Sequence, residues 1–293
     1  MDAIQLCLRA VASPGDIIVT ESPTFPCYLQ LIEDLGMLSL EVPTSPQSGI
    51  DIDALEKAIG THKVSACILN PHFHNPLGFF MPPDRQEQLV EMLAKKKIPA
   101  IEDDIYGDLY FSSTRPHTLK SLDREGLVLY CSSFSKTLAS DLRIGWTMPG
   151  RFSHKVKRLK FNSTITSPKL NQLIIADFLQ SGHYERHLRL FRNALKKQMT
   201  NTALAIAEHF PNETKLTAPE GGFILWVTLN KKVDALHLFH TAKREKIFII
   251  PGTICSSTGR FANCLRISCG HPWNDKMEEG MHKLGQLIHS LSS

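Results

Sequence analysis

The stretch "LVLYCSSFSKTLASDLRIGW", residues 127–146, places Lys136 directly after a strand-like apolar run and a cluster of small hydroxyl residues. A lysine held at the carboxyl end of a buried strand is partly desolvated. Desolvation lowers the pKa of its amine and makes that amine a better nucleophile. The alternative is a lysine in a solvated turn, and the spacing alone leaves both interpretations open.

Outward from this stretch, short apolar runs alternate with helical ones. Further strands are predicted at residues 16–21, 38–42, 65–70, 99–104 and 143–148. Helices are predicted in "DIDALEKAIG" (51–60) and "PPDRQEQLVEMLAKKKIP" (82–99), which open on acids or prolines and close on glycine or lysines. This alternation predicts an α/β fold with a mostly parallel sheet sandwiched by helices, which binds its ligands at the carboxyl ends of the strands.

The pattern changes after Pro149. Residues 151–210 are predicted to be mainly helical, and the remainder reads as a small α+β unit. We therefore expect a large domain over residues 1–190 and a small C-terminal domain over residues 191–293. The opening "MDAIQLCLRAV" reads as a helix with no cap before it, so we expect the large domain to be truncated at its N-terminus.

Composition excludes several other classes of protein. The formal net charge of +4 is too small to argue for nucleic-acid binding. No apolar run approaches the ~20 residues that span a bilayer. The opening "MDAIQLCLRAV" lacks the basic region and the small-residue cleavage site of a signal peptide. The thirteen histidines show no zinc-binding spacing, so no metal is expected. The seven cysteines include no C-x-x-C pair, which favours reduced thiols in a cytoplasmic protein.

Polar residues also stand at two other strand ends. "EDDIYGDL" (102–109) places Asp103 and Tyr106 beyond an apolar run, and "HNPLG" (74–78) places Asn75 in a turn that we assign to the end of the strand at 65–70. Taken alone, residues 102–109 are consistent with a solvated loop, and residues 74–78 with an ordinary turn. Together with Lys136 they offer an acid, a phenol, an amide and an amine. That set suits a planar cofactor with a ring nitrogen and a phenolic oxygen.

The stretch "SSFSKTLASDLRIGW" (132–146) resembles the lysine motif of fold-type-I pyridoxal-phosphate enzymes, specifically the class I/II aminotransferases. "HNPLG", "EDDIYGDL", "PEGGFILWV" (219–227) and "NCLRISCG" (263–270) resemble their companion motifs, in the right order and over nearly the whole chain. These motifs are most similar to those of the aminotransferase-like domain of MocR-type GntR regulators. The 2-aminoadipate and kynurenine aminotransferases are the next most similar group. The resemblance implies the aspartate aminotransferase fold.

The resemblance also implies roles around the cofactor ring. Lys136 would form a Schiff base with pyridoxal 5'-phosphate and move the proton during transfer. Asp103 would keep the pyridine nitrogen protonated, and Tyr106 and Asn75 would hydrogen-bond the phenolic oxygen.

Roles at the edges of the site follow in the same way. Ser133, Ser135 and Arg143 would bind the phosphate, and Phe25 would stack on the ring. Arg266, with Asn75, would bind the substrate α-carboxylate. Each role has a simpler alternative: an Arg143 pair with Asp141, a surface arginine on the small domain, or a core phenylalanine.

Four features depart from the family pattern. Ser140 and Asp141 replace the usual Pro-Gly, Phe25 replaces a commoner tyrosine, and Cys255 stands where an aromatic residue is frequent. The family's first phosphate-binding turn and N-terminal arm, and the winged helix of a MocR regulator, are not found before Met1.

Three functions stay open. The chain is an aminotransferase acting on an amino acid and a 2-oxo acid, the effector-sensing domain of a regulator, or an inactive shortened product. The resemblance implies a homodimer without membrane association, and contact with DNA only if a winged-helix domain is supplied upstream.

Overall fold

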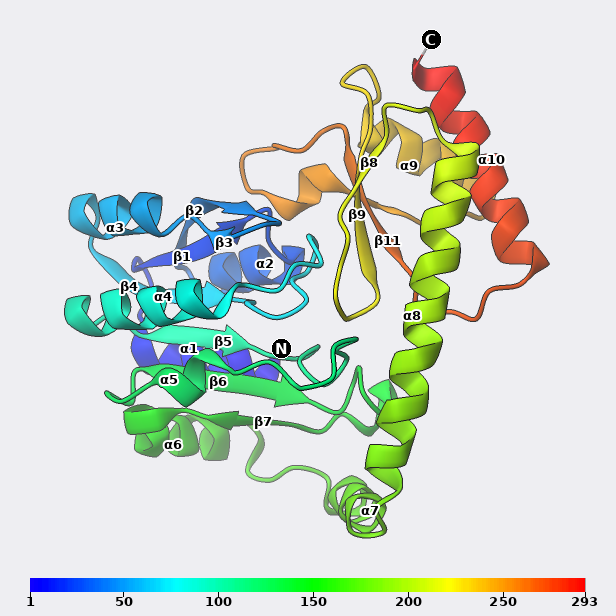
Figure 1. Cartoon of the computed structure of the whole chain (residues 1–293). Coiled ribbons are helices and arrows are strands. Elements are labelled where there is room, and N and C mark those ends of the chain that lie inside the picture. Colours follow the sequence, from blue (N-terminus) through cyan, green and yellow to red (C-terminus); the bar gives the residue numbers. More distant parts are fainter. Residues whose placement is uncertain (293) are drawn as a thin grey trace.

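The computed structural model describes residues 1–292, and these form two β-sheets with helices on their faces (Figure 1). The larger sheet has five parallel central strands and one antiparallel strand at each edge. Its spatial order is β3 (Gly49–Ile50), β2 (Leu38–Ser45), β1 (Ile17–Ser22), β4 (Val64–Leu69), β5 (Ala100–Asp103), β6 (Val128–Ser133) and β7 (Gly145–Met148).

Alternate residues of the central strands face different helices. Ile68 and Ile101 pack against α1 (Asp2–Val11) and α2 (Pro26–Asp34). Their neighbours in sequence, among them Cys67 and Ala100, pack with the opposite helical layer: α3 (Ile52–Thr61), α4 (Pro83–Lys96) and α5 (Leu119–Leu122). This period of two decides which side each polar residue at the end of β5 faces. Asp103 continues the Ile101 side toward α2, whereas Glu102 continues the Ala100 side and accepts the Leu119 N–H at 2.8 Å.

The smaller sheet is antiparallel, in the order β10 (Ile250–Pro251), β11 (Cys264–Ser268), β9 (Ile224–Thr228) and β8 (Lys215–Leu216). Its core joins Leu225 and Val227 to α8 (His183–His209), α9 (Ala235–Arg244) and α10 (Asp275–Ser292). The remaining helices are α6 (Ser153–Thr164), α7 (Lys169–Gln180) and the 3₁₀ turns η1 (Ser140–Leu142), η2 (Gly150–Phe152) and η3 (Gly252–Cys255). The long α8 runs beside both sheets, and the expected boundary at residues 190–191 falls within it (Figure 1).

The two sheets share packing at the carboxyl ends of the central strands, which point toward the smaller sheet (Figure 1). Trp226 belongs to the same apolar cluster as Leu77 and Phe79. Between these two residues, Gly78 has φ +72°, and a Cβ there would lie 2.6 Å from Cγ of Pro219. A glycine is therefore required where the 74–78 turn meets the smaller sheet.

The expected fold is confirmed in detail. All six strand predictions match observed strands, with ends shifted by at most three residues. The short β3 was not predicted. The helix predicted over 82–99 ends with Lys97 in the left-handed region, at φ 58°. All seven cysteines are free and six are buried, as the reduced-thiol interpretation requires. Within residues 1–292, every helix is too short or too polar to cross a membrane.

Candidate functional site

Asp103 ends β5, and its carboxylate is almost fully buried at 8 % exposure. Oδ2 accepts a hydrogen bond from the hydroxyl of Tyr28, and Oδ1 accepts the Ile105 N–H at 3.2 Å. Burial raises the pKa of Asp103, although the Tyr28 hydrogen bond acts to lower it. An ionised carboxylate offers about four acceptor positions, so this group keeps room for a further donor.

Tyr106, Asn75 and Arg266 meet beside this carboxylate. Arg266, on β11, donates from Nη1 to the Asn75 Oδ1 at 2.9 Å, which joins the two sheets across the site. Burial raises the pKa of Tyr106, while the nearby Arg266 charge and a hydrogen bond with Asn75 act to lower it. The Arg266 Nε is buried and has no hydrogen-bond partner within residues 1–292. An unpartnered buried donor on a cation indicates a position for an anion.

Lys136 lies in the turn after β6, and its side chain is exposed. The Ser135 N–H donates to the Ser133 Oγ at 3.2 Å and shapes this turn. Desolvation lowers the pKa of Lys136, and the positive charges of Arg266 and Arg143 lower it further. The fold brings Arg266, from the smaller sheet, close to Lys136 and Arg143. No carboxylate within residues 1–292 forms an ion pair with any of them.

Arg143 follows η1 in the left-handed conformation, at φ 52°. Its Nη1 donates to the Ser140 carbonyl at 3.1 Å. Asp141 is exposed and accepts a hydrogen bond from the Ser140 hydroxyl at 3.1 Å, so the simpler alternative of an Arg143–Asp141 pair is wrong. The guanidinium is left for an external anion.

Phe25 is the residue immediately before α2 and is half-buried. Its ring meets the ring of Tyr28 edge-on, with centroids 5.4 Å apart and an interplanar angle of 86°. Phe25 is thereby linked to Asp103 through Tyr28. All nine residues predicted for the site thus belong to this region, through direct contacts, electrostatic proximity or the Lys136 turn.

Sequence reasoning missed two residues that hold the site together. Asn70, and not Asn75, directly follows β4: Asn75 lies five positions further on, and its N–H donates to the Asn70 Oδ1 at 2.8 Å. The Asn70 Nδ2 donates to the Asp103 carbonyl at 2.7 Å. The signal available for Asn70 was its place at the end of an apolar strand. Nothing in the sequence assigned Tyr28 to the site, apart from its position three residues after Phe25.

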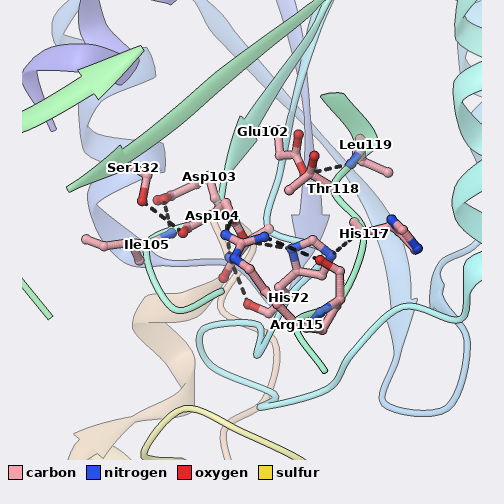
Figure 2. Close-up of polar contacts among 12 residues, drawn as sticks. His72, Glu102, Asp103, Asp104, Ile105, Arg115, His117, Thr118, Leu119 and Ser132 are labelled. Atoms are coloured by element: carbon pink, nitrogen blue, oxygen red, sulfur yellow. Dashed lines mark hydrogen bonds and ion pairs between the residues drawn. The ribbon is translucent and has the colours of Figure 1, made fainter. Parts of the chain in front are cut away.

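A second polar network lies on the other side of the β5 end (Figure 2). Asp104 Oδ1 is 2.6 Å from His72 Nδ1, and Oδ2 pairs with Arg115 and accepts the Tyr130 hydroxyl at 2.9 Å. Burial acts to raise the pKa of Asp104, but the His72 and Arg115 contacts outweigh it and lower that pKa. Groups of the protein thus already occupy the acceptor positions of the Asp104 carboxylate, and these contacts hold the segment after β5 against the sheet.

The arrangement around Asp103 has a definite chemical capacity. A buried carboxylate can pair with a protonated ring nitrogen, and a phenol and an amide can hydrogen-bond a ring oxygen. A lysine with a lowered pKa can attack an aldehyde, and two arginines without carboxylate partners can bind two anionic groups.

The family model described as aminotransferase class I and II matches residues 2–284. An uncharacterised HTH-type transcriptional regulator of Escherichia coli, YjiR, is 37% identical over 98% of this chain and 61% of its own length. The 2-aminoadipate transaminase of Thermus thermophilus is 29% identical over 99% of this chain and 73% of its own. The chain spans about three fifths of the length of the regulators that it matches.

Solved structures agree with this assignment of fold. The kynurenine aminotransferase of Pyrococcus horikoshii gives a TM-score of 0.91 at 29% identity, covering 98% of this chain and 72% of that one. The α-aminoadipate aminotransferase LysN of Thermus thermophilus, solved with N-(5'-phosphopyridoxyl)-L-leucine, gives 0.93 at 28% identity, covering 99% and 75%. A mutant aspartate aminotransferase from the same organism gives 0.84 at 18% identity and confirms the expected aspartate aminotransferase fold.

Proposed function

The chain belongs to the class I and II aminotransferases, and from this premise we propose that it binds pyridoxal phosphate through Lys136 and transfers an amino group between an amino acid and a 2-oxo acid. The observation that carries the proposal is the shared region of Asp103, Tyr106, Asn75, Arg266 and Lys136. The cofactor, when bound, supplies a ring that accepts the electrons of the substrate Cα–H bond. The chain's own residues bind, orient and move protons around that ring.

Four residues act on the ring itself. Asp103, buried and only partly occupied by donors, pairs with the ring nitrogen and keeps it protonated. Tyr106 and Asn75 hold the phenolic oxygen. The Lys136 amine would condense with the cofactor's aldehyde and release water, and its lowered pKa keeps more of that amine in the neutral, nucleophilic form at a given pH.

Two anion positions frame the ring. We assign Arg143, with Ser133 and Ser135, to the cofactor phosphate, because its guanidinium has no carboxylate partner within residues 1–292. We assign Arg266 to the substrate α-carboxylate, because its buried Nε is unsatisfied. Asn75 orients it through the 2.9 Å hydrogen bond. Phe25, at the start of α2, covers one face of the ring.

A second copy of this chain is the proposed partner, in a cytoplasmic homodimer. The helices α6 and α7 expose apolar side chains, including Phe161 at 62 %, Ile165 at 73 % and Leu170 at 68 %. Beside them lies an open groove of about 530 Å³ lined by Leu138, Ala139, Leu142, Leu173, Ile174, Asp177 and Phe178. This apolar surface begins close to the Lys136 turn, so a second copy that covers it would also border the site.

A second function is favoured by one observation. The regulators YjiR and YdcR are more similar to this chain, at 37% and 36% identity, than the 2-aminoadipate transaminase, at 29%. The same site would then sense an amine as the effector domain of a MocR-type regulator, with DNA binding supplied by a winged-helix domain upstream. A third possibility from the sequence, an inactive shortened product, predicts no cofactor binding at all.

One titration separates these functions. Purified protein is titrated with pyridoxal phosphate, and the absorption of bound cofactor is followed while single amino acids are added. Spectral change with release of a 2-oxo acid supports the aminotransferase, and spectral change without product supports the sensor. If no cofactor binds, the proposal fails.

Two lysine variants test the assigned attachment point. Lys136→Ala is expected to abolish the covalent cofactor spectrum. Lys63→Ala removes an exposed lysine before β4, at the opposite end of the sheet, and is expected to leave the spectrum unchanged. A Lys136→Ala variant that keeps the spectrum would show that another amine holds the cofactor.

A further inference from the structure

We propose that Tyr28 is a positioning residue that holds the Asp103 carboxylate in place, ionised, for the cofactor's ring nitrogen. This inference rests on the proposed function. The Tyr28 hydroxyl donates to Oδ2 of Asp103 from α2, a helix whose other contribution to the site is the Phe25 ring at its start. The two residues are 75 positions apart in sequence and meet only in the folded chain.

The tyrosine ring has little freedom to move. Tyr28 is 2 % exposed and packs in the apolar cluster that contains Ile68 and Ile101, under the central strands. Phe25 meets it edge-on, and the Tyr28 N–H donates to the Phe25 carbonyl at 2.9 Å. A ring fixed in this way delivers its hydroxyl to one position, which a flexible or solvated donor would not do.

The carboxylate is correspondingly fixed on both oxygens. Tyr28 occupies one acceptor position of Oδ2, the Ile105 N–H occupies one of Oδ1, and Asn70 holds the Asp103 carbonyl. About two acceptor positions of the carboxylate remain. They suffice for a ring N–H, so Tyr28 restricts the orientation of the group without filling it.

The choice of a phenol matters chemically. A neutral donor stabilises the ionised carboxylate without neutralising its charge, whereas an arginine or lysine in the same place would compete with the protonated ring nitrogen. Burial works in the opposite direction, since it raises the pKa of Asp103. Without the Tyr28 hydroxyl, Asp103 would take up a proton more readily and would pair less well with a cationic ring.

The chain provides a matched control. Tyr130 is also a buried tyrosine, and its hydroxyl donates at 2.9 Å to Asp104, the neighbouring carboxylate on the other side of β5. Tyr28→Phe and Tyr130→Phe each remove one buried hydroxyl from one aspartate. The aspartate affected by Tyr28→Phe, Asp103, faces the site, whereas the one affected by Tyr130→Phe, Asp104, does not.

The test compares the affinity of the full chain and both variants for two ligands. One ligand is pyridoxal phosphate, and the other is its analogue with carbon in place of the ring nitrogen. Tyr28→Phe is expected to weaken binding of pyridoxal phosphate about tenfold, which corresponds to roughly 1.4 kcal/mol. Binding of the analogue should change less than about twofold, because it lacks the group that Asp103 recognises. Tyr130→Phe should change neither affinity.

Two results would overturn the inference while leaving the proposed function intact: equal weakening of both ligands by Tyr28→Phe, which indicates a structural role only, or no weakening of either. A wild-type chain that binds no pyridoxal phosphate would instead overturn the proposed function. An Asp103→Asn background provides a second measurement. There the added Tyr28→Phe change should weaken pyridoxal phosphate binding by less than about twofold, because its effect passes through the carboxylate.

Discussion

Asp103 and Asp104 are consecutive residues of the same type, and they lie in opposite electrostatic environments. Asp103 receives hydrogen bonds from neutral groups only, the Tyr28 hydroxyl and the Ile105 N–H, and its pKa is raised by burial. Asp104 pairs with His72 and Arg115 and accepts the Tyr130 hydroxyl, and its pKa is lowered (Figure 2).

The difference in partners gives the two aspartates different roles at the end of β5: Asp103 is available to a ligand, and Asp104 stabilises the fold. A buried carboxylate without a hydrogen-bonded cation is costly for the free protein, although the charge of the N-terminal amine acts to lower the pKa of Asp103. Part of that cost is recovered when a cationic ligand binds. A buried carboxylate that already has its cations stabilises the fold and has little capacity left for a ligand. The comparison therefore predicts that matched substitutions at positions 103 and 104 have opposite consequences.

The largest expected effect comes from Asp103→Asn. Transaminase activity should fall by about 100-fold or more, because a neutral amide does not stabilise the protonated ring nitrogen. The free energy of unfolding of the cofactor-free protein should change by less than about 1 kcal/mol, since the amide replaces a carboxylate that forms no ion pair. Steady-state kinetics and urea unfolding measure the two quantities. Full activity in this variant would remove Asp103 from the site.

Asp104→Asn should show the reverse pattern. The free energy of unfolding should fall by about 3 kcal/mol, because Arg115 loses one of its two carboxylate partners and the buried His72 loses its carboxylate contact. Pyridoxal phosphate affinity of the folded variant, measured at low temperature, should stay within about threefold of wild type. A loss of affinity with unchanged stability would show that the roles of the two aspartates are reversed.

The pH dependence of stability sharpens the comparison. The folded-state pKa of Asp104 lies below its usual value of 3.8, so its contribution is fully present above that value and is lost as the pH falls through the folded pKa. The stability difference between wild type and Asp104→Asn should therefore be constant near neutral pH and shrink at pH values below 3.8. Urea unfolding at a series of pH values measures this. A difference that grows on acidification would contradict the assignment.

The smallest effect is expected from Tyr130→Phe, which removes one of several donors to Asp104 and leaves the Arg115 ion pair and the His72 contact in place. The free energy of unfolding should fall by about 1 kcal/mol. The thermal unfolding midpoint reports this change, with Tyr28→Phe measured beside it. A loss as large as that of Asp104→Asn would mean that the hydroxyl, and not the ion pairs, sustains the network.

Much of the site was accessible from the sequence, because its residues stand next to strand ends. Lys136 follows β6, Asp103 ends β5, and Asn75 lies in a turn with a glycine that the packing requires. Tyr28 was not accessible, because nothing in "ESPTFPCYLQ" distinguishes a tyrosine that reaches a buried carboxylate from one that fills the core. The environment of Asp104 was equally hidden, since His72 and Arg115 lie 32 and 11 positions away in sequence.

The sequence by itself determined the α/β alternation, the strand ends and the residue types available there, because hydrophobic periodicity and chain punctuation are local properties. Only the tertiary structure decided which of two adjacent carboxylates pairs with an arginine and which receives hydrogen bonds from neutral donors alone. That outcome depends on the alternation of side chains across β5 and on a helix, a strand and loops from distant parts of the chain, which together determine the partners and desolvation of each charge.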